Sequence, residues 1–401
     1  MRAVRHGLLI CLGALTLAPV PPLGHAAPPP AGHQYFVYIG TYTGPKSKGI
    51  YAYRYDAAAF KLDAIGLVGE MVRPSFLTLH PNGRFLYAVS ELGNDGRENG
   101  SITAFRIDRN SGALTALNTV SSGGGGACHL VVDKTGKCLL VANYGTGSAA
   151  AFAVNPDGRL SGPTALMQHS GSSVDRRRQA GPHAHAVVLS ADDRFVFVPD
   201  LGLDRIFSYR LDPATAHLTP NDPPFVAVKP GSGPRHFAFS PNGGFAYSVH
   251  EMGSMVTAFA YEAASGKLTQ LQTISTLPAD FHGEDNSAEI EVDARGRFLY
   301  ASNRGHDSIA IHRIDPRSGR LTYVDHAAAQ GRTPRSFCLD PGGRLLLVAN
   351  QDSDTIVTFR IDARSGKLQP TGHVAHVPTP VCVKIRAPAI ATSKGGHAWR
   401  Q

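Results

Sequence analysis

A phrase that recurs about every 50 residues constrains the fold of this chain more than any other feature. Each copy has an apolar run that ends in Asp or a similar turn residue, then a short turn, then a second apolar run. The turns with their second runs read PNGRFLYAV (81–89), KTGKCLLVAN (134–143), ADDRFVFV (191–198), PNGGFAYSV (241–249), ARGRFLYASN (294–303) and PGGRLLLVAN (341–350). A period of this length, with turn residues at fixed offsets, is typical of a β-propeller.

A third apolar stretch follows in seven copies, at 49–56, 101–108, 148–155, 205–212, 255–262, 308–315 and 355–362. After a short turn, each is followed by a fourth stretch that begins near a leucine, namely Leu62, Leu114, Leu160, Leu218, Leu268, Leu321 and Leu368. Alternation of side chains, as in the ITAFRI segment from Ile102, is typical of strands rather than helices. We therefore predict an all-β chain with four antiparallel strands in each blade.

Residues 34–386 are predicted to form a single domain whose two ends share one blade. The first blade begins at Gln34 and lacks an innermost strand, while the apolar run Pro380–Ile385 has no partner of its own. Placing that run in the first blade closes a ring of seven blades and removes the exposed strand edges. A row of separate sandwich domains is the alternative, but it leaves both terminal fragments unpaired.

The segment 1–26 has the pattern of a secretory signal peptide. Arg2 and Arg5 precede an apolar stretch at 7–18, which is followed by small residues suited to cleavage. No apolar run of 18 residues occurs after residue 30, so we predict no membrane span in the mature chain. The protein is expected to be exported, either periplasmic or secreted, with a disordered polar tail at 387–401.

Charge and cysteine content narrow the expected partners. The formal net charge is +8, but only Arg176–Arg178 forms a basic run, so we expect no nucleic-acid partner. The cysteines of the predicted mature chain have neither zinc-site nor redox-motif spacing, and whether any of them pair is left open; they are Cys128, Cys138, Cys338 and Cys382. We expect a monomer without a cofactor or a resident metal.

Unusual polar residues occur where innermost strands begin and second strands end. In an antiparallel blade these two points lie at the same face, so these residues share one mouth of the central channel. They include His129, His183, His185, Arg235, His236, Glu289 and Arg335 on one side of the hairpins, and Glu91, Asp200, His250, Glu251, Asn303 and Arg304 on the other. Such a ring suits an anionic substrate and acid–base chemistry, although the same residues could brace neighbouring blades.

Four phrases resemble the seven-bladed lactonase family, which includes propeller-type 6-phosphogluconolactonase and fungal carboxymuconate cyclase. They are GPRH (233–236), HEMGS (250–254), ASNRGHDSI (301–309) and PRSF (334–337). The resemblance extends from about Tyr35 to Ile385 and is most specific in the first and third phrases. It implies a metal-independent site of one histidine, one glutamate and two arginines.

The matching motifs place these implied catalytic residues at Glu251, His185, Arg235 and Arg304. Glu251 is expected to be the general acid/base, with His185 assisting, while the arginines hold an anionic group or a developing oxyanion. The residues expected to bind substrate around them are His129, His183, His236, Glu289, Asn303 and Arg335.

Four nearby features have no assigned role at this level. His250 stands beside Glu251 where the family often has a small or apolar residue. His306 is expected to be a turn or rim residue, and the 281–287 stretch offers oxygen and nitrogen ligands without a recognised metal spacing. The loop containing Arg176–Arg178 either overhangs the mouth or is a solvated insertion.

The predicted function is hydrolysis of a small anionic sugar lactone. A muconate-type lactonising cyclase and a non-catalytic propeller that binds protein or carbohydrate are the alternatives, because propellers host all three. A binding module is expected to present aromatic residues on its rim, yet the one tryptophan, Trp399, lies in the tail. Export argues against 6-phosphogluconolactone itself as the substrate, because that lactone is a cytoplasmic metabolite.

Overall fold

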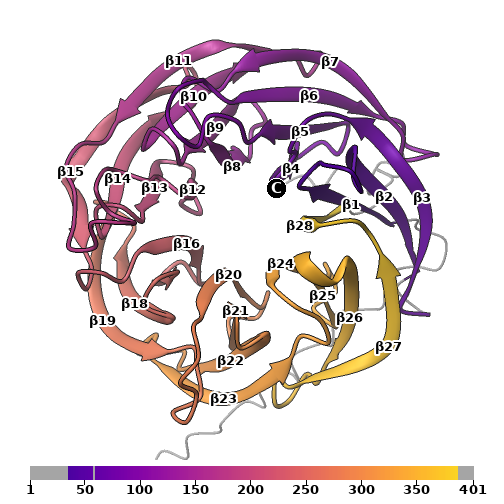
Figure 1. The fold of residues 1–401 in the computed structure, drawn as a ribbon. Coiled ribbons are helices and arrows are strands. Elements are labelled where there is room, and N and C mark those ends of the chain that lie inside the picture. The colour runs from indigo at the N-terminus through magenta and orange to yellow at the C-terminus, as the bar shows by residue number, and fades with distance from the viewer. Residues whose placement is uncertain (1–34, 57–58, 387–401) are drawn as a thin grey trace, which may run out of the picture.

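The structure, a computed structural model, describes residues 35–56 and 59–386. These residues form seven four-stranded antiparallel sheets arranged as blades around a central axis (Figure 1). The only helix in the described residues is a 3₁₀ turn at Gln351–Ser353. The predicted signal peptide at 1–26 and the predicted disordered tail at 387–401 lie outside these residues.

The innermost strands of blades 1 to 7 surround the axis. They are β28 (Pro380–Arg386), β4 (Leu77–Leu79), β8 (Ala127–Val132), β12 (Val188–Leu189), β16 (Pro234–Phe239), β20 (Asn286–Val292) and β24 (Pro334–Leu339). The second strands are β1 (Tyr35–Thr41), β5 (Phe85–Ser90), β9 (Cys138–Asn143), β13 (Phe195–Asp200), β17 (Phe245–His250), β21 (Phe298–Arg304) and β25 (Leu345–Asn350).

The third strands are β2 (Gly49–Asp56), β6 (Ser101–Ile107), β10 (Ser148–Val154), β14 (Arg205–Asp212), β18 (Met255–Glu262), β22 (Ser308–Ile314) and β26 (Thr355–Ile361). The outermost strands are β3 (Lys61–Glu70), β7 (Leu114–Ser121), β11 (Leu160–Gln168), β15 (His217–Ala227), β19 (Lys267–Ser275), β23 (Leu321–Ala328) and β27 (Leu368–His376). These bounds agree with the predicted third and fourth stretches to within about one residue, the precision expected at strand ends.

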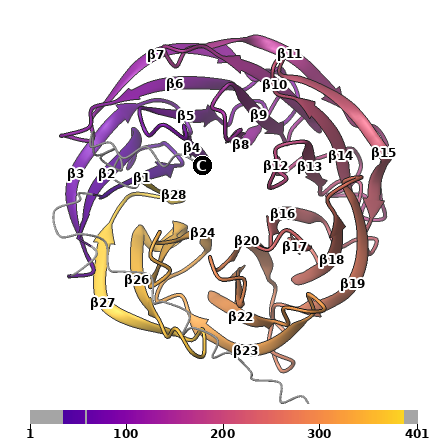
Figure 2. The ribbon, with the colours of Figure 1, turned by 180° about the vertical axis from the view of Figure 1, so that it is seen from behind.

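Ring closure follows the prediction. β28 pairs with β1 in an antiparallel register that joins Phe36 to Arg386 and Ile39 to Val383. The two strands, from opposite ends of the chain, lie side by side in both views of the ring (Figures 1 and 2). The shared blade therefore leaves no open sheet edge at the junction.

The hydrophobic core lies between the blades, because both faces of the inner strands are covered. Alternate residues of β1 belong to two different clusters: Phe36 and Tyr38 pack towards blade 2, whereas Val37 and Ile39 pack towards blade 7. Every residue of β5, β9 and β13 is buried, while the outer strand β7 has no buried residue. This two-sided burial explains why the second strands read as continuous apolar runs.

A repeated contact joins neighbouring blades at four of the seven junctions and accounts for part of the sequence repeat. The Tyr87 hydroxyl donates a 3.0 Å hydrogen bond to the carbonyl of Gly158 in the following blade. Gly158 has φ +88°, and a Cβ there would lie 2.4 Å from the Phe85 ring, so only glycine fits. The same tyrosine-to-glycine bond recurs at Tyr38, Tyr247 and Tyr300.

Candidate active site

The innermost strands carry β-bulges where they enter the channel mouth. The pairing of β16 with β17 skips Arg235, and equivalent shifts in β8, β24 and β28 skip Cys128, Arg335 and Val381. In β20 the irregular step includes Glu289. A bulge turns the unpaired side chain away from the regular pleat. All five of these residues line one pocket.

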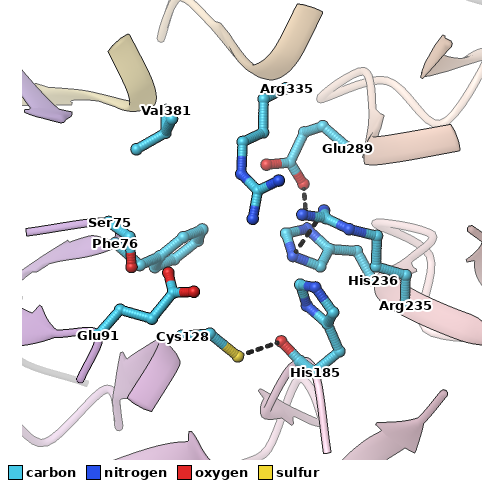
Figure 3. Close-up of a pocket in the computed structure, with 10 residues that line it drawn as sticks. All are labelled: Ser75, Phe76, Glu91, Cys128, His185, Arg235, His236, Glu289, Arg335 and Val381. Atoms are coloured by element: carbon cyan, nitrogen blue, oxygen red, sulfur yellow. Dashed lines mark hydrogen bonds and ion pairs between the residues drawn. The ribbon is translucent and has the colours of Figure 1, made fainter. Parts of the chain in front are cut away.

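That pocket encloses about 260 Å³, part of it open to solvent, and its residues come from every blade (Figure 3). Phe76, Cys128 and Val381 form an apolar side, contributed by blades 2, 3 and 1. The polar side is formed by residues of blades 4 to 7, listed here as His185, Arg235, His236, Glu289 and Arg335. A ligand in this pocket would therefore meet charged groups from blades 4 to 7 on one side and, on the other, apolar groups beside Ser75 and the carboxylate of Glu91.

Glu251 is the centre of a charged cluster that adjoins the polar side of the pocket through Arg235 and His185. Its Oε2 accepts hydrogen bonds from Arg235 Nε and Arg304 Nη2, both at 2.9 Å, and its Oε1 accepts one from Arg178 Nη2 at 2.6 Å. Burial alone would raise the pKa of Glu251, but the charges of Arg304 and Arg235 outweigh burial and hold this pKa well below its ordinary value. The carboxylate is therefore ionised at neutral pH.

His185 lies on the pocket wall beside this carboxylate. Its Nε2 is 4.0 Å from Glu251 Oε2, and its buried Nδ1 has no hydrogen-bond partner in the described residues. Burial, followed by the charge of Arg235, lowers the pKa of His185 well below its ordinary value. The ring is therefore neutral near pH 7 and free to accept a proton or to donate a hydrogen bond.

His236 and Glu289 hold Arg235 in place. The Nδ1–H of His236 donates to Glu289 Oε1 at 2.6 Å, which leaves Nε2 to accept a 3.1 Å bond from Arg235 Nη1. Arg235 Nη1 also donates to the carbonyl of Ala288 at 2.8 Å. Because the Nε2 lone pair is engaged by a guanidinium, His236 orients Arg235 rather than serving as a free base.

A second polar chain crosses the opposite part of the mouth. Arg335 Nη2 donates to the Tyr42 hydroxyl at 2.8 Å, and that hydroxyl donates to Glu91 Oε2 at 3.0 Å. Burial and the neighbouring Glu91 raise the pKa of Tyr42 to about 12, so the phenol keeps its proton. The chain holds the Arg335 guanidinium where Figure 3 shows it, directed into the pocket.

The geometry assembles the parts needed for proton transfer next to an anion site. It combines an ionised carboxylate, a neutral imidazole and three arginines at one mouth of the channel. Cys128 supplies no nucleophile at neutral pH, because burial raises the pKa of its thiol. These groups suit the hydrolysis of an ester bond in an anionic compound.

Comparison with known proteins identifies the family. A family model described as "Lactonase, 7-bladed beta-propeller" matches residues 36–385. The chain belongs to this lactonase family. A curated relative named 6-phosphogluconolactonase, from Bacillus subtilis, is 35% identical over 308 residues, covering 77% of this chain and 86% of the relative.

Solved structures agree with this membership of the lactonase family. The periplasmic gluconolactonase PpgL of Pseudomonas aeruginosa is 37% identical, with a TM-score of 0.82, covering 88% of this chain and 99% of that one. A putative 6-phosphogluconolactonase from Bacteroides fragilis is 33% identical, with a TM-score of 0.83 and coverage of 89% and 99%.

Within this lactonase, the predicted site residues separate into two groups. The four predicted catalytic residues meet around Glu251. Two of them, His185 and Arg235, line the pocket together with Arg335, His236 and Glu289. His129 packs under it, with its ring centroid 4.1 Å from that of Phe76. His183 stacks on Tyr144, with ring centroids 4.4 Å apart, and its Nδ1–H donates to the Tyr144 carbonyl at 2.9 Å. His183 is not among the residues that line the pocket.

Asn303 does not reach the pocket. Its side chain is fully buried, accepts a hydrogen bond from Ser287, and donates to the Thr276 carbonyl at 2.7 Å. Asn143 and Asn350 make equivalent bonds to the carbonyls of Ser122 and Ala329. The Asn at this strand end therefore joins neighbouring blades wherever it recurs, which is the bracing role that the sequence left open.

The structure also places residues whose role the sequence left open. His250 is fully buried and its Nδ1 bonds the Ser232 hydroxyl at 2.8 Å, behind the site. His306 lies outside the pocket, where Nδ1 bonds Ser308 at 2.7 Å. In the described residues no group of three or more His, Cys, Asp or Glu could hold a metal ion, and Cys128, Cys138, Cys338 and Cys382 are all free.

Three residues near the site were not among the predicted catalytic or substrate-binding residues, although Glu91 was placed at the channel mouth. Arg178 contacts Glu251 directly, which settles the open question about its loop in favour of an overhang. Tyr42 and Glu91 anchor Arg335. Glu91 was identifiable from its position at the end of β5, which is equivalent to that of Glu251, whereas nothing local to Tyr42 indicates its position. In addition, β12 begins only at Val188, so His185 precedes the strand that it was expected to open.

Among the residues that the structure describes, no helix has the length and apolar character needed to cross a bilayer.

Proposed function

We propose that this lactonase hydrolyses a sugar lactone, in the manner of a 6-phosphogluconolactonase, by metal-independent acid–base chemistry at the channel mouth. The observation that carries the proposal is Glu251, an ionised carboxylate enclosed by arginines beside the neutral ring of His185. The curated relative in Bacillus subtilis carries the name 6-phosphogluconolactonase, which supports this reaction class.

The proposed reaction needs one water and no external acid or base. Glu251 accepts a proton as the water oxygen attacks the lactone carbonyl and forms a tetrahedral oxyanion. The bond between the carbonyl carbon and the ring oxygen then breaks, and the ring oxygen receives that proton with the help of His185. The product is a hydroxy acid, which ionises at neutral pH and releases one proton to solution.

The arginines have different proposed roles because they are held differently. Arg235 is fixed by Glu251, His236 and the Ala288 carbonyl, so its guanidinium is preorganised to stabilise the oxyanion. Arg304 donates to backbone carbonyls and to Glu251, and Arg335 is anchored through Tyr42. We assign these two to binding the anionic groups of the substrate.

The charges around Glu251 support metal independence. Three guanidinium groups lie within hydrogen-bond distance of the one carboxylate. A divalent cation at this carboxylate would be repelled by all three, and it would have to displace their hydrogen bonds. The same positive charge would stabilise the negative charge that develops on the carbonyl oxygen, which is the usual task of a metal in hydrolysis.

We further propose that the protein is exported. The pattern at 1–26 supports this, and a solved relative in Pseudomonas aeruginosa is described as a periplasmic gluconolactonase. Detection of the protein in periplasmic or culture fractions of the native host, with its N-terminus near residue 27, is the expected result. A chain that keeps Met1 and stays in the cytoplasm would refute it.

A lactone panel tests the reaction. The purified protein is assayed by proton release with glucono-1,5-lactone, 6-phosphoglucono-1,5-lactone and a carboxylated sugar lactone, each with and without a chelator, and spontaneous hydrolysis is subtracted. We expect turnover of at least one lactone that is unchanged by chelation. Loss of turnover on chelation, restored by calcium or zinc, would refute metal independence, and consumption of a muconate without lactone hydrolysis would favour the cyclase.

A further inference from the structure

Arg178 reaches Glu251 from outside the repeated blades. It lies on the 169–187 loop between β11 and β12, the longest outer-to-inner connection among the described residues. The other two arginines on this carboxylate, Arg235 and Arg304, belong to strands β16 and β21. Glu251 therefore pairs with two arginines from the strands of the blades and with a third arginine from an inserted loop.

The backbone of this loop is fixed although it lies at the rim. Asp204 Oδ2 accepts hydrogen bonds from Ser173 at 2.6 Å and from the buried Gln179 side chain at 2.8 Å. Asp175 Oδ1 accepts from the backbone N–H of Arg178 at 3.0 Å. These bonds on both sides hold the Cα of Arg178 in place, so that motion of its guanidinium needs only side-chain rotation.

The three arginines differ in how readily they can leave the carboxylate. The side chain of Arg178 is 40% exposed, compared with 3% for Arg235 and 14% for Arg304. Moving a buried arginine would leave an unpaired charge in the interior, which is costly. Arg178 can rotate into solvent without this cost, because a partly exposed ion pair contributes little.

Arg178 hinders proton transfer from water to Glu251, because it occupies one of the two acceptor positions of Oε1 and stabilises the ionised carboxylate. Oε2 is held by the two buried arginines, and Arg178 occupies Oε1 at 2.6 Å. Release of Arg178 would free Oε1 and would also remove one of the charges that make the carboxylate a weak base. A phosphate or carboxylate on the substrate could draw this guanidinium away, since such anions bind its planar fork in a bidentate manner.

We propose that Arg178 is a substrate-operated gate: an anionic group on the lactone takes its guanidinium from Glu251 and thereby frees Oε1 for proton transfer. The proposal rests on the proposed hydrolysis. It makes Arg178 the residue that selects anionic over neutral lactones. The exposed neighbours Arg176 and Arg177 add positive charge near the same rim, but in this loop it is Arg178 that contacts Glu251.

The experiment compares Arg178→Gln with the matched control Arg177→Gln on a neutral and a phosphorylated gluconolactone and on a carboxylated sugar lactone. In Arg178→Gln we expect kcat/KM to fall about 10- to 100-fold for anionic lactones, the effect of losing a charge-assisted hydrogen bond. For the neutral lactone, kcat should rise, because Arg178 no longer occupies Oε1, and an unchanged or lower kcat would count against the gate. Whether the phosphorylated or the carboxylated lactone shows the larger fall identifies the anion.

Chemical rescue separates a gate from a structural role. Inorganic phosphate added with the neutral lactone should raise kcat of the wild type, because it draws Arg178 away, and should have no effect on Arg178→Gln. If Arg178→Gln and Arg177→Gln lose the preference for anionic over neutral lactones equally, that preference depends on the overall charge of the loop, and the proposal is overturned. An unchanged preference in Arg178→Gln would also overturn it.

Calorimetric titration with inorganic phosphate needs no turnover and so distinguishes this proposal from the hydrolysis on which it rests. Phosphate binding that weakens in Arg178→Gln but not in Arg177→Gln supports capture of the anion by Arg178, even if no lactone in the panel is hydrolysed. In that case only the proposed hydrolysis fails. Identical phosphate binding by the wild type and Arg178→Gln would overturn the gate.

Discussion

Replacing Glu251 by glutamine tests the proposed chemistry most directly. The amide keeps the size of the side chain, but it cannot accept the proton of the attacking water. Loss of a positioned general base lowers kcat by about 10²–10⁴-fold, equivalent to about 3–5 kcal/mol of activation free energy. We expect an effect of this size on kcat at saturating lactone.

The same change affects stability by an amount that the contacts allow us to work out. Glu251 pairs with the buried guanidiniums of Arg235 and Arg304. Glutamine leaves these two positive charges without their counter-charge, and removing one partner of a buried ion pair costs about 3–5 kcal/mol. The partly exposed Arg178 adds little. The loss is smaller than the free energy of unfolding of ordinary domains, about 5–15 kcal/mol, so the variant should remain folded.

The assay measures proton release and urea-induced unfolding on the same preparations. Glu262→Gln is the matched control, because Glu262 is an exposed carboxylate in the same blade. Glu91 is unsuitable as a distant control, although it ends the equivalent strand, because it lines the pocket. A folded Glu251→Gln protein with the kcat of the Glu262→Gln control would refute the assignment of Glu251 as acid/base.

Three further outcomes test the binding assignment, the buried histidines and the ring. Arg304→Ala should raise KM more than it lowers kcat, as steady-state kinetics would show, because Arg304 is assigned to binding; a fall in kcat alone would contradict this. Burial lowers the pKa of His250 to about 4, so the unfolded chain takes up a proton first as pH falls below about 6.5. His250 should therefore lower the free energy of unfolding by about 1.4 kcal/mol per pH unit down to about pH 4. Urea titrations should find this pH-dependent contribution missing in His250→Gln but present in the exposed control His373→Gln. Deleting the chain after Pro378 removes β28 and should cause aggregation, whereas a soluble, cooperatively unfolding truncation would contradict the shared blade.

The strands were predictable because their signals are local. The turn before Phe85 and the alternation after Ser101 lie within a few residues of the strands that they define. Ring closure was predictable for a different reason. The N-terminal blade lacks one strand and the C-terminal strand lacks a partner, so pairing the two completes both. The tyrosine-to-glycine bonds between blades link residues about 70 positions apart, and they became visible only in the structure.

The site was predictable to the extent that topology determined it. Arg235 lies near the start of the first strand of one hairpin and Glu251 follows the end of the second strand. Antiparallel pairing brings these two points together, so their contact was predictable. Arg178 was not assigned to the site because a loop position depends on anchors such as Asp204, which lies far from it in sequence. The bulge that exposes Arg235 was also not predictable, because the sequence does not show which residue the register skips.

The bulges explain how a nearly symmetric ring can carry an asymmetric site. Each repeated bulge presents one side chain to the mouth, and the backbone there is similar from blade to blade. The residue type at that position therefore determines the chemistry of each sector, with Cys128 and Val381 on the apolar side and Arg235, Glu289 and Arg335 on the charged side. In the proposed sugar lactone the ring carbons carry neutral hydroxyl groups, whereas a phosphate or carboxylate group carries the charge that arginines bind. We therefore expect the arginines at the bulges, Arg235 and Arg335, to orient the charged groups of the substrate, so that the repeat itself supplies the binding site.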